Sequence, residues 1–406
     1  MKFSVGYFGT TYPSQRMILN KVHACSYQKL TPKNIIIIYG LIAVGKVFPK
    51  FRVSSLYAKY VHFHLNVFSN RKVSLIHTFN RICVNDNYSW CGTFEKTFPE
   101  YFCDERHLNE KSIKKQANYI LKDNCKQIFP LSNWSYQYEK WLLGKVLTQK
   151  QVDAICEKMT VLYPPQQLLT TEDEIRQKYA NIESRKLHLI YVGGQIKRKG
   201  GMSVLRVLDD LSRIYSFEAT VIGNLNDGVG NYYLNDTEME ECQTIIENSK
   251  WLHYHQKLAN SEVLSLIKAS DVGLLPTIGD TFGFSVLEMQ ASGCPVVTTN
   301  REAMPEINNR ETGWIIDTKS INVLNGDDYA NYSSNEIEQF ICVIEKQLRQ
   351  TLVTIFDDPS RISSKALNAF EKVARDNYPK KYEEELYSFY TKIFDSDSNS
   401  RKEESR

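Results

Sequence analysis

The 406-residue sequence contains no long hydrophobic run and has little net charge. Its longest apolar stretch, residues 35–44, is about half as long as the ~20 residues that a membrane-spanning helix needs. A formal net charge of +3 argues against a dedicated nucleic-acid binder, which usually has a strongly basic domain. We therefore expect a protein that neither spans a membrane nor binds nucleic acid.

The nine cysteines include no Cys-x-x-Cys pair, and their number is odd. Neither a zinc site nor a disulfide framework is expected, and reduced thiols in the cytoplasm are the simpler interpretation. The chain begins with a strand-like run at residues 2–8 in place of a charged segment and an apolar signal core. An Asp-x-Asp motif occurs at Asp395 and Asp397, but it lies in a polar tail, so no metal site is predicted.

Short apolar runs alternate regularly with helix-like segments along the chain. Strands that alternate with helices are typical of parallel sheets and of the α/β class, and the length favours two domains of similar size. The expected strands are residues 3–8, 35–39, 73–77, 90–94 and 128–131 in the first half and 187–192, 219–222, 272–275 and 295–298 in the second.

The expected domain boundaries follow from composition. The polar stretch Gln166–Arg185 comes after a pair of prolines, and we interpret it as the interdomain linker. This interpretation places one domain at residues 1–170 and the other at 187–375. An apolar stripe at helical spacing predicts a packing helix over 378–394. The charged and small polar residues 395–406 predict a disordered tail.

The most informative segment is Ser270–Gly293, where a buried strand leads into a loop with Gly279 and Gly283. A helix is expected to begin near Phe284, and the unpaired N–H groups and the dipole of a helix start form an anion site suited to a diphosphate. Glu288, one turn into this helix, would be repelled by phosphate and fits better as an acceptor for sugar hydroxyls such as a ribose diol. The alternative is an ordinary strand–loop–helix turn with Glu288 on the surface.

A second glycine-bearing loop, within Tyr191–Gly201, also follows a strand and precedes a helix. It holds Lys197, Arg198 and Lys199, and three cations at the carboxyl end of a strand would neutralise a diphosphate. A basic loop by itself is more often simply solvated. Two anion-binding loops on one sheet, however, favour a binding site.

These two segments resemble the donor domain of GT-B glycosyltransferases, especially members of glycosyltransferase family 4. The family's E-x-F-G-x4-E motif corresponds to Asp280–Gly283 followed by Glu288, and its R-K-G-G loop corresponds to Arg198–Gly201. The resemblance is strong over residues 187–317, loose over 70–165 and faint before 70. It implies the GT-B fold, in which two Rossmann-like α/β domains have parallel sheets that face each other across a cleft.

The resemblance also implies roles for individual residues. The implied donor-binding residues are Glu288, Gly283, Phe284, Ser285, Arg198, Lys197, Gly194 and Tyr254. Among them, Glu288 would bind the ribose, while Lys199 would counter the charge of the leaving diphosphate and Asp280 would contact the transferred sugar. Such enzymes work without a metal or a separate cofactor, so cations and a helix start must stabilise the leaving group.

Three positions depart from the family pattern. Asp280 is one carbon shorter than the family's glutamate, and Gly194 stands where relatives usually have a phosphate-binding arginine. Glu95 stands where relatives usually have a histidine near the reacting sugar. A carboxylate there can act as a general base or stabilise an oxocarbenium ion. The predicted catalytic residues are therefore Asp280, Glu95 and Lys199.

We accordingly predict a retaining, metal-independent glycosyltransferase of the hexosyltransferase type that serves polysaccharide biosynthesis. It would move a sugar from a nucleotide diphosphate sugar to a glycan, polysaccharide or lipid-linked acceptor held by the first domain. The alternative is a catalytically impaired homologue that binds nucleotide-sugar or glycan as a partner subunit. A dinucleotide oxidoreductase is disfavoured because no G-x-G-x-x-G follows the first strand of either half.

The run Lys111–Lys122 allows two interpretations. It is either the solvated face of an ordinary helix or a basic amphipathic helix that docks on the inner face of the membrane. The second interpretation applies if the acceptor is lipid-linked.

Overall fold

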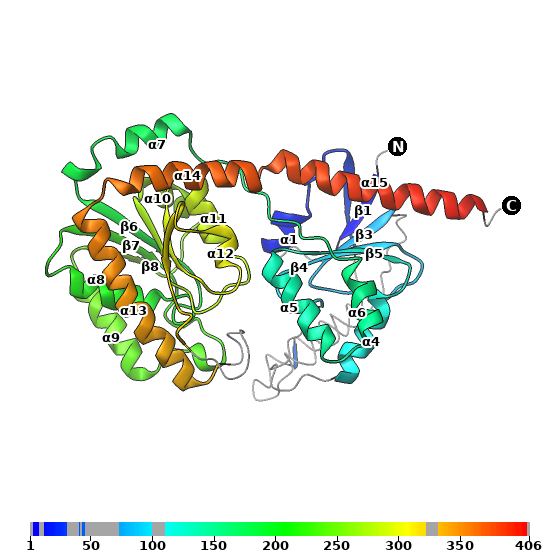
Figure 1. Cartoon of the computed structure of the whole chain (residues 1–406), viewed down its shortest axis with the longest axis horizontal. Helices are drawn as coiled ribbons and strands as arrows, with labels where there is room; N and C mark the ends of the chain where they lie inside the picture. Colours follow the sequence, from blue (N-terminus) through cyan, green and yellow to red (C-terminus); the bar gives the residue numbers. More distant parts are fainter. Residues whose placement is uncertain are drawn as a thin grey trace. The chain divides into compact units, whose positions relative to one another are not determined.

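A computed structural model shows the fold and describes residues 3–7, 12–30, 40, 43–44, 73–99, 110–321 and 332–403. The expected strand at residues 35–39 lies outside these residues. The chain forms two compact units, labelled by their elements in Figure 1. The N-terminal unit comprises residues 1–165 and 379–406, and the C-terminal unit comprises residues 166–378.

The N-terminal unit is built on a parallel sheet with the strand order β2-β1-β3-β4-β5. The strands are β1 (Phe3–Tyr7), β2 (Cys25–Lys29), β3 (Leu75–Phe79), β4 (Trp90–Phe94) and β5 (Cys125–Pro130). Four of them overlap expected strands, and β3 and β4 are buried along their whole length, as their apolar sequences predict. The edge strand β2 was not predicted, because its sequence CSYQK is polar and only its first residue is buried.

Helices pack on this sheet and close its core. They are α1 (Tyr12–Met17), α4 (Glu110–Ile120), α5 (Asn133–Gly144), α6 (Gln149–Cys156) and α15 (Pro379–Glu403). Trp90, Phe94 and Phe98 form the aromatic centre of a buried cluster to which α4, α5 and α6 all contribute. The basic run Lys111–Lys122 therefore contains a helix, α4, whose apolar face is part of the core.

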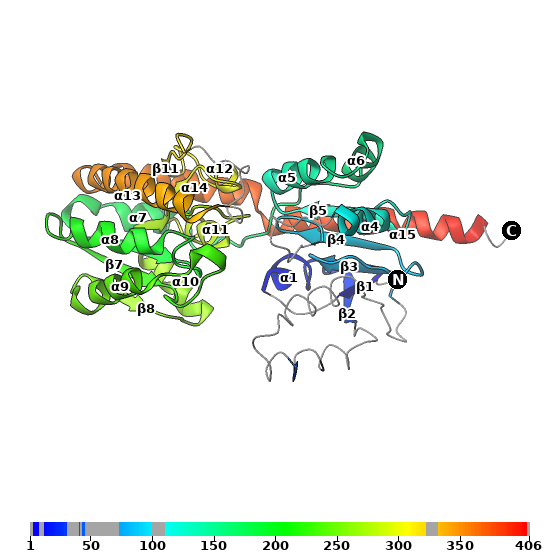
Figure 2. The same cartoon turned by 90° about the horizontal axis from the view of Figure 1, so that it is seen from below.

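The long helix α15 returns the end of the chain to the N-terminal unit (Figure 2). The Tyr382 hydroxyl donates to the carbonyl of Met17 over 2.6 Å, and the Phe394 ring stacks on Phe3 with centroids 4.0 Å apart. The predicted apolar stripe is thus a packing face. The helical backbone continues through Glu403, so the prediction of a disordered tail from residue 395 is not supported up to that residue.

The C-terminal unit has a parallel six-stranded sheet with the order β11-β10-β9-β6-β7-β8. The strands are β6 (Leu187–Val192), β7 (Phe217–Ile222), β8 (Leu252–His255), β9 (Val272–Leu275), β10 (Val296–Thr299) and β11 (Gly313–Ile316). The four expected strands of this half are present within two residues of their predicted bounds. The two parallel sheets confirm the predicted α/β class.

The helices of the C-terminal unit lie in two groups, one on each side of the sheet (Figure 1). One group is α8 (Gly201–Leu211), α9 (Asp236–Asn248) and α13 (Ser334–Asp357). The other is α7 (Glu172–Tyr179), α10 (Asn260–Ala269), α11 (Phe284–Ala291) and α14 (Arg361–Asp376), and the short helix α12 (Met304–Ile307) follows β10. Both faces of the sheet are therefore covered, which explains why its strands are apolar without alternation.

The predicted linker Gln166–Arg185 is instead part of the C-terminal unit, and it contains helix α7. The Tyr179 hydroxyl lies 2.8 Å from the carbonyl oxygen of Gly293, and Arg185 forms a two-pronged ion pair with buried Asp271 at 2.6 and 2.7 Å. Thr171 caps the start of the helix, and its side chain and that of Glu174 accept hydrogen bonds from each other's backbone N–H groups. Polarity alone suggested a linker, but these buried polar contacts hold the segment against the sheet.

Candidate active site

The strand order of the C-terminal sheet fixes where a ligand can bind. Numbered along the chain from β6, the strands lie in the order 3-2-1-4-5-6, so the chain reverses direction across the sheet between β6 and β9. In open α/β sheets, ligands bind beyond the carboxyl ends of the strands at this switch point. The loops that leave β6 and β9 are the two segments singled out from the sequence, residues 193–200 and 276–283.

These two loops touch each other directly. The backbone N–H of Ile278 donates to the carbonyl of Arg198 over 2.9 Å. At Gly200, φ is +81°, and an added Cβ would lie 2.3 Å from the carbonyl oxygen of Pro276. Only glycine permits both this backbone conformation and this close approach. The loop after β6 is therefore locked against the loop after β9.

An ion pair links the two loops at the site. The ammonium nitrogen Nζ of Lys199 lies 2.9 Å from Oδ2 of Asp280, and both side chains are largely buried. Burial by itself would raise the pKa of Asp280, but the positive charges of Lys199 and Arg198 outweigh burial and hold this pKa below its ordinary value. Asp280 is therefore an anion at neutral pH, and it forms an ion pair with Lys199, the lysine predicted to contact a diphosphate.

Asp280 also shapes the start of helix α11. Its Oδ1 accepts hydrogen bonds from the backbone N–H of Gly283 at 3.1 Å and of Phe282 at 3.4 Å. The N–H of Gly283, predicted to serve the phosphates, is thus already bonded to a carboxylate. The predicted helix start at Phe284 is correct. The buried Oγ of Ser285, in the first turn, has no hydrogen-bond partner among the described residues.

Glu288 lies in the second turn of α11 and is buried, with 8% of its surface exposed. The structure therefore excludes the alternative in which Glu288 is a surface residue. A buried carboxylate is costly unless polar groups surround it. Its position on the helix that begins at the switch point is consistent with the predicted contact to sugar hydroxyls.

The other two cations of the basic loop have different surroundings. Arg198 is buried and donates to Oε1 of Gln195 at 2.6 Å and to the carbonyl of Gly279, so it braces both loops. Lys197 donates to both carboxylate oxygens of Glu238 on α9, at 2.6 and 2.8 Å, and both side chains are over 90% buried. The structure thus gives Lys197 a structural partner, and its predicted contact with phosphate gains no support.

Gly194 faces a carboxylate that sequence reasoning missed. Oδ2 of Asp227 accepts from the N–H of Gln195 at 2.9 Å, and a Cβ on Gly194 would lie 2.7 Å from the same oxygen. The space that a larger side chain would need is occupied by Asp227. No motif marks this residue, and the only available signal was its place in the loop after β7, next to the switch point.

Tyr254 lies on β8, two strands from β6. Its half-buried hydroxyl donates to the carbonyl of Gly223 over 2.7 Å, while the N–H of Gly223 donates to the carbonyl of His255. Tyr254 therefore holds the loop after β7 at the carboxyl edge of the sheet. This position is compatible with the expected neighbourhood of the base.

Glu95 belongs to the N-terminal unit, directly after β4. Its N–H donates to Oδ1 of Asn80 over 3.1 Å, and its carbonyl accepts from the hydroxyl of Ser135 on α5. Glu139, one turn further along α5, is fully buried and accepts from the N–H of Phe98 at 3.1 Å. Burial raises the pKa of Glu139 to about 8. Helix α5 therefore positions the whole loop that carries Glu95, which local sequence patterns did not reveal.

Comparison with known proteins identifies the fold. The two parallel Rossmann-like sheets are those of the GT-B fold, which confirms the fold that the resemblance in the sequence implied. Residues 171–327 match the family described as Glycosyl transferases group 1. The matched residues contain both loops of the candidate site.

Individual relatives are distant. The chain is 28% identical over 171 residues to the "Uncharacterized 41.2 kDa protein in cps region" of Klebsiella pneumoniae, covering 41% of this chain and 43% of that protein. It is 26% identical over 133 residues to D-inositol 3-phosphate glycosyltransferase of Corynebacterium jeikeium, covering 31% of this chain and 30% of that one. The alignments therefore span less than half the length of these two relatives.

The fold extends the similarity over nearly the whole chain. The structure of HepE from Anabaena, solved in complex with UDP and glucose, has a TM-score of 0.57 with 10% sequence identity. The match covers 96% of this chain and 100% of that chain. At this identity the comparison establishes the fold alone.

Proposed function

We propose that this chain is a glycosyltransferase that takes a sugar from a nucleoside diphosphate sugar bound at the carboxyl edge of the six-stranded sheet. The observation that carries this proposal is the convergence of Lys199 and Asp280, 2.9 Å apart, at the start of helix α11. A cation, a helix N-terminus and a carboxylate beside each other suit an anionic leaving group joined to a polar sugar. The match of residues 171–327 to glycosyl transferases group 1 supports the same assignment.

The donor would extend along the loops at the switch point. Its diphosphate would contact Lys199, the N–H groups of Phe284 and Ser285, and the Ser285 hydroxyl, whose oxygen has no partner among the described residues. Glu288 would accept hydrogen bonds from the ribose hydroxyls. The positive charge of Arg198 would attract the diphosphate while its hydrogen bonds to Gln195 and Gly279 hold the two loops together. HepE of Anabaena, solved with UDP and glucose, supports a nucleotide of this kind.

We further propose that transfer proceeds with retention of anomeric configuration and without a metal. The bond between the anomeric carbon and the diphosphate oxygen breaks, and the acceptor hydroxyl oxygen bonds to the same face of that carbon. The acceptor proton goes to the departing diphosphate oxygen or to a general base, the role that the sequence resemblance assigns to Glu95. Lys199 and the N-terminus of α11 stabilise the negative charge that grows on the leaving group. Asp280 would hold the transferred sugar.

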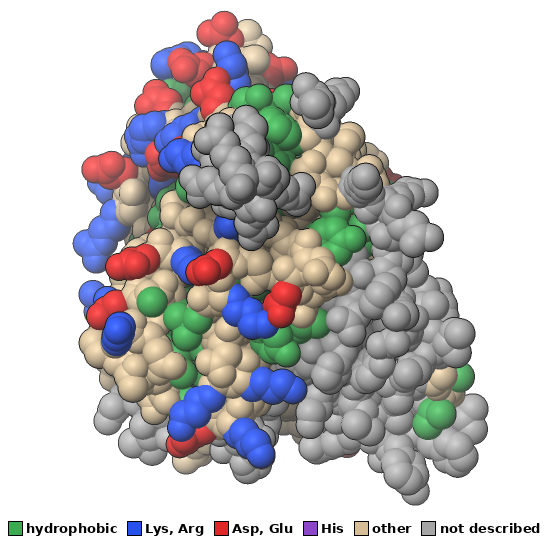
Figure 3. Space-filling model, turned by 90° about the vertical axis from the view of Figure 1, so that its right-hand side faces the viewer, with side chains coloured by type: hydrophobic (Ala, Val, Ile, Leu, Met, Phe, Trp, Pro, Cys, Tyr) green, Lys and Arg blue, Asp and Glu red, His purple; other side chains and the backbone are tan. Residues whose placement is uncertain are grey.

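The acceptor would be a glycan, a polysaccharide or a lipid-linked sugar. One relative is described as a D-inositol 3-phosphate glycosyltransferase, and this description supports a polyol or saccharide acceptor. No helix within the described part of the chain has the length and apolarity to cross a membrane. On the part of the face in Figure 3 whose residues the structure describes, basic and acidic side chains lie intermixed.

A donor screen tests the proposal. The purified protein is incubated with UDP-, GDP- and ADP-sugars, and released nucleoside diphosphate and transferred sugar are measured. We expect turnover with at least one donor and none with Glu288→Ala, while Glu172→Ala, an exposed carboxylate on α7, behaves as wild type. The proposal would be refuted if the protein neither turned over nor bound, by calorimetry, any of these nucleoside diphosphate sugars.

The second candidate function is that of a catalytically impaired homologue that binds nucleotide-sugar or glycan within a larger assembly. The replacement of the family's arginine by Gly194, with Asp227 beside it, favours this candidate because the site has one cation fewer and one carboxylate nearby. Donor binding without turnover, unchanged in the variant Glu95→His, would support it. Turnover by the wild-type protein would exclude it.

A further inference from the structure

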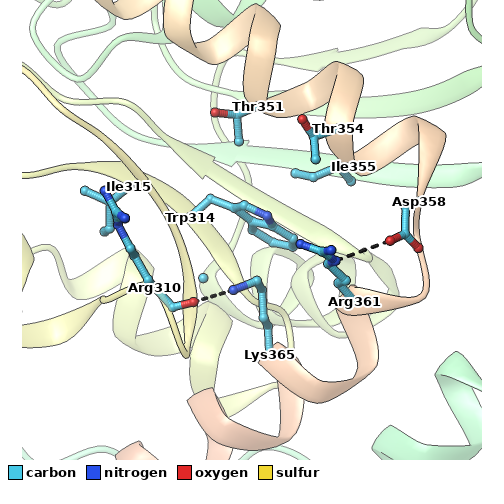
Figure 4. A pocket seen from close by; sticks show the side chains of 10 residues that line it. Arg310, Trp314, Ile315, Thr351, Thr354, Ile355, Asp358, Arg361 and Lys365 are labelled. Carbon is cyan, nitrogen blue, oxygen red and sulfur yellow. Dashed lines mark hydrogen bonds and ion pairs between the residues drawn. The ribbon is translucent and has the colours of Figure 1, made fainter.

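A pocket lies away from the candidate active site, at the opposite edge of the C-terminal sheet. Figure 4 shows it between the start of β11, the end of α13 and the start of α14. Its volume is about 260 Å³. Gly313, the first residue of β11, is among its lining residues and pairs with Val296, the first residue of β10. The pocket is therefore at the amino edge of the sheet, away from Lys199 and Asp280.

The lining of this pocket is strongly cationic. Arg310, Arg361 and Lys365 contribute three positive charges, against the single carboxylate of Asp358. Arg361 pairs with Asp358 at 3.2 Å, but both side chains are about half exposed or more, so this pair contributes little. These cations repel one another, although the carboxylates of Glu311 and Asp317, outside the lining, compensate Lys365 and Arg310 in part, and an anion would relieve the remaining repulsion.

Lys365 shows the effect of this repulsion. It lies one helical turn after Arg361 on the same face of α14, and its Nζ donates to the backbone carbonyl of Arg310. Burial lowers the pKa of Lys365 and the neighbouring charge of Arg361 lowers it further, while the carboxylate of Glu311 offsets part of this decrease. The lysine is thus held in place with its charge only partly stabilised, and an anionic group would supply the missing stabilisation.

An aromatic platform stands beside these cations. The Trp314 side chain lies in the middle of the group of side chains in Figure 4, and Nζ of Lys365 is 5.2 Å from its ring centroid. Thr351 and Thr354 line the α13 side of the pocket, where the Thr354 hydroxyl donates to the carbonyl of Gln350 over 3.0 Å. An indole face packs well against the apolar C–H face of a sugar ring. A bare inorganic anion would leave this platform unused.

We propose that this pocket binds an anionic sugar, with the sugar ring on Trp314 and its carboxylate or phosphate between Arg361 and Lys365. The ligand is either a free sugar phosphate or an acidic residue within a glycan, because both present the same ring and charge. The proposal is independent of the function proposed for the carboxyl edge of the sheet. It adds a second saccharide contact to the C-terminal unit.

Calorimetric titration of the full-length protein tests this site. The probes are glucose 6-phosphate, glucuronate, a trimer of galacturonic acid, neutral glucose and inorganic phosphate. We expect the charged sugars to bind at least tenfold more tightly than glucose. Each of Arg361→Gln and Lys365→Gln should weaken the binding of the charged sugars at least tenfold. Trp314→Leu should weaken the binding of the sugars and leave the binding of inorganic phosphate unchanged.

Two controls separate this site from the donor site and from nonspecific charge effects. Glu288→Ala should bind the charged sugars as wild type does. Arg213→Gln, an exposed arginine 3.5 Å from Asp209, should also have no effect. Tighter binding of the trimer than of the monosaccharides would identify a glycan residue as the ligand, and equal binding a free sugar. Equal affinity for glucose and its phosphate, or binding that survives the Arg361→Gln and Lys365→Gln double variant in a folded protein, would overturn the proposal.

Discussion

Replacing Asp280 by asparagine separates the charge of this residue from its structural contacts. Asparagine retains an oxygen in the position of Oδ1, which caps Gly283 at 3.1 Å, so the start of α11 should keep its geometry. The substitution removes the negative charge that lies 2.9 Å from the ammonium group of Lys199. We therefore expect Asp280→Asn to bind a nucleoside diphosphate more tightly than the wild-type protein, because Lys199 is released to meet it.

The size of this gain follows from the ion pair. Two unit charges about 3 Å apart interact by about 5 kcal/mol at an effective dielectric constant of ~20. Desolvation of the released lysine and salt screening offset most of that energy, so we expect a net gain of about 1–2 kcal/mol, or about 5–30-fold in affinity. Transfer should change in the opposite direction, because the transferred sugar loses a charged acceptor, and hydrogen bonds to charged groups are worth about 1.5–3 kcal/mol, or about 10–150-fold in kcat.

The assay is calorimetric titration of wild type, Asp280→Asn and Asp280→Ala with the nucleoside diphosphate of the donor that the screen identifies. Asp280→Ala loses the cap as well as the charge, so it should bind more weakly than Asp280→Asn. Asp358→Asn removes a carboxylate from the amino edge of the sheet and serves as the remote control. Weaker diphosphate binding by Asp280→Asn, with the helical content of the protein unchanged, would refute the claim that this ion pair competes with the diphosphate.

Three further predictions follow from single residues. Lys199→Ala should lower kcat more than donor affinity, because leaving-group charge peaks in the transition state; steady-state kinetics showing only a raised KM would contradict this role. Burial raises the pKa of Glu139 to about 8, so the folded protein keeps a proton that the unfolded chain releases above a pH of about 4.5. As the pH rises from about 4.5 to about 8, this residue should therefore lower the free energy of unfolding by about 1.4 kcal/mol per pH unit. Glu139→Gln should abolish that part of the slope in urea unfolding at pH 5 to 8, and an unchanged slope would show that Glu139 ionises normally. Gly200→Ala should lower stability by about 1–3 kcal/mol because its Cβ would meet Pro276, whereas Gly230→Ala, with positive φ but open space, should cost less; equal losses would rule out the contact between loops.

The sequence was sufficient to predict the class of fold and the two loops of the candidate site. Buried parallel strands are continuous apolar runs, and the runs that became β6 and β9 are each followed by a glycine-bearing loop. That pattern predicted that both loops lie on one sheet. It did not predict the ion pair between Lys199 and Asp280, because these residues are 81 positions apart and only the crossover between β6 and β9 brings them together.

Other contacts escaped prediction for the same reason. Lys197 meets Glu238 from 41 residues away, and nothing in either local sequence indicates that pairing. The edge strand β2 is too polar to be distinguished from a loop. In one case a usable signal was present: Thr171 and Glu174 form the S/T-x-x-E pattern that marks a helix start, within a stretch whose polarity suggested a linker.

The path of helix α15 determines which unit a C-terminal truncation would affect. The C-terminal unit is one uninterrupted stretch of chain, residues 166–378, whereas the N-terminal unit also includes residues 379–406. From α15, Tyr390 supplies the hydroxyl 2.7 Å from the buried ring nitrogen of His77. Removal of the chain from Pro379 onward should therefore destabilise the N-terminal unit while the contacts within the C-terminal unit are kept.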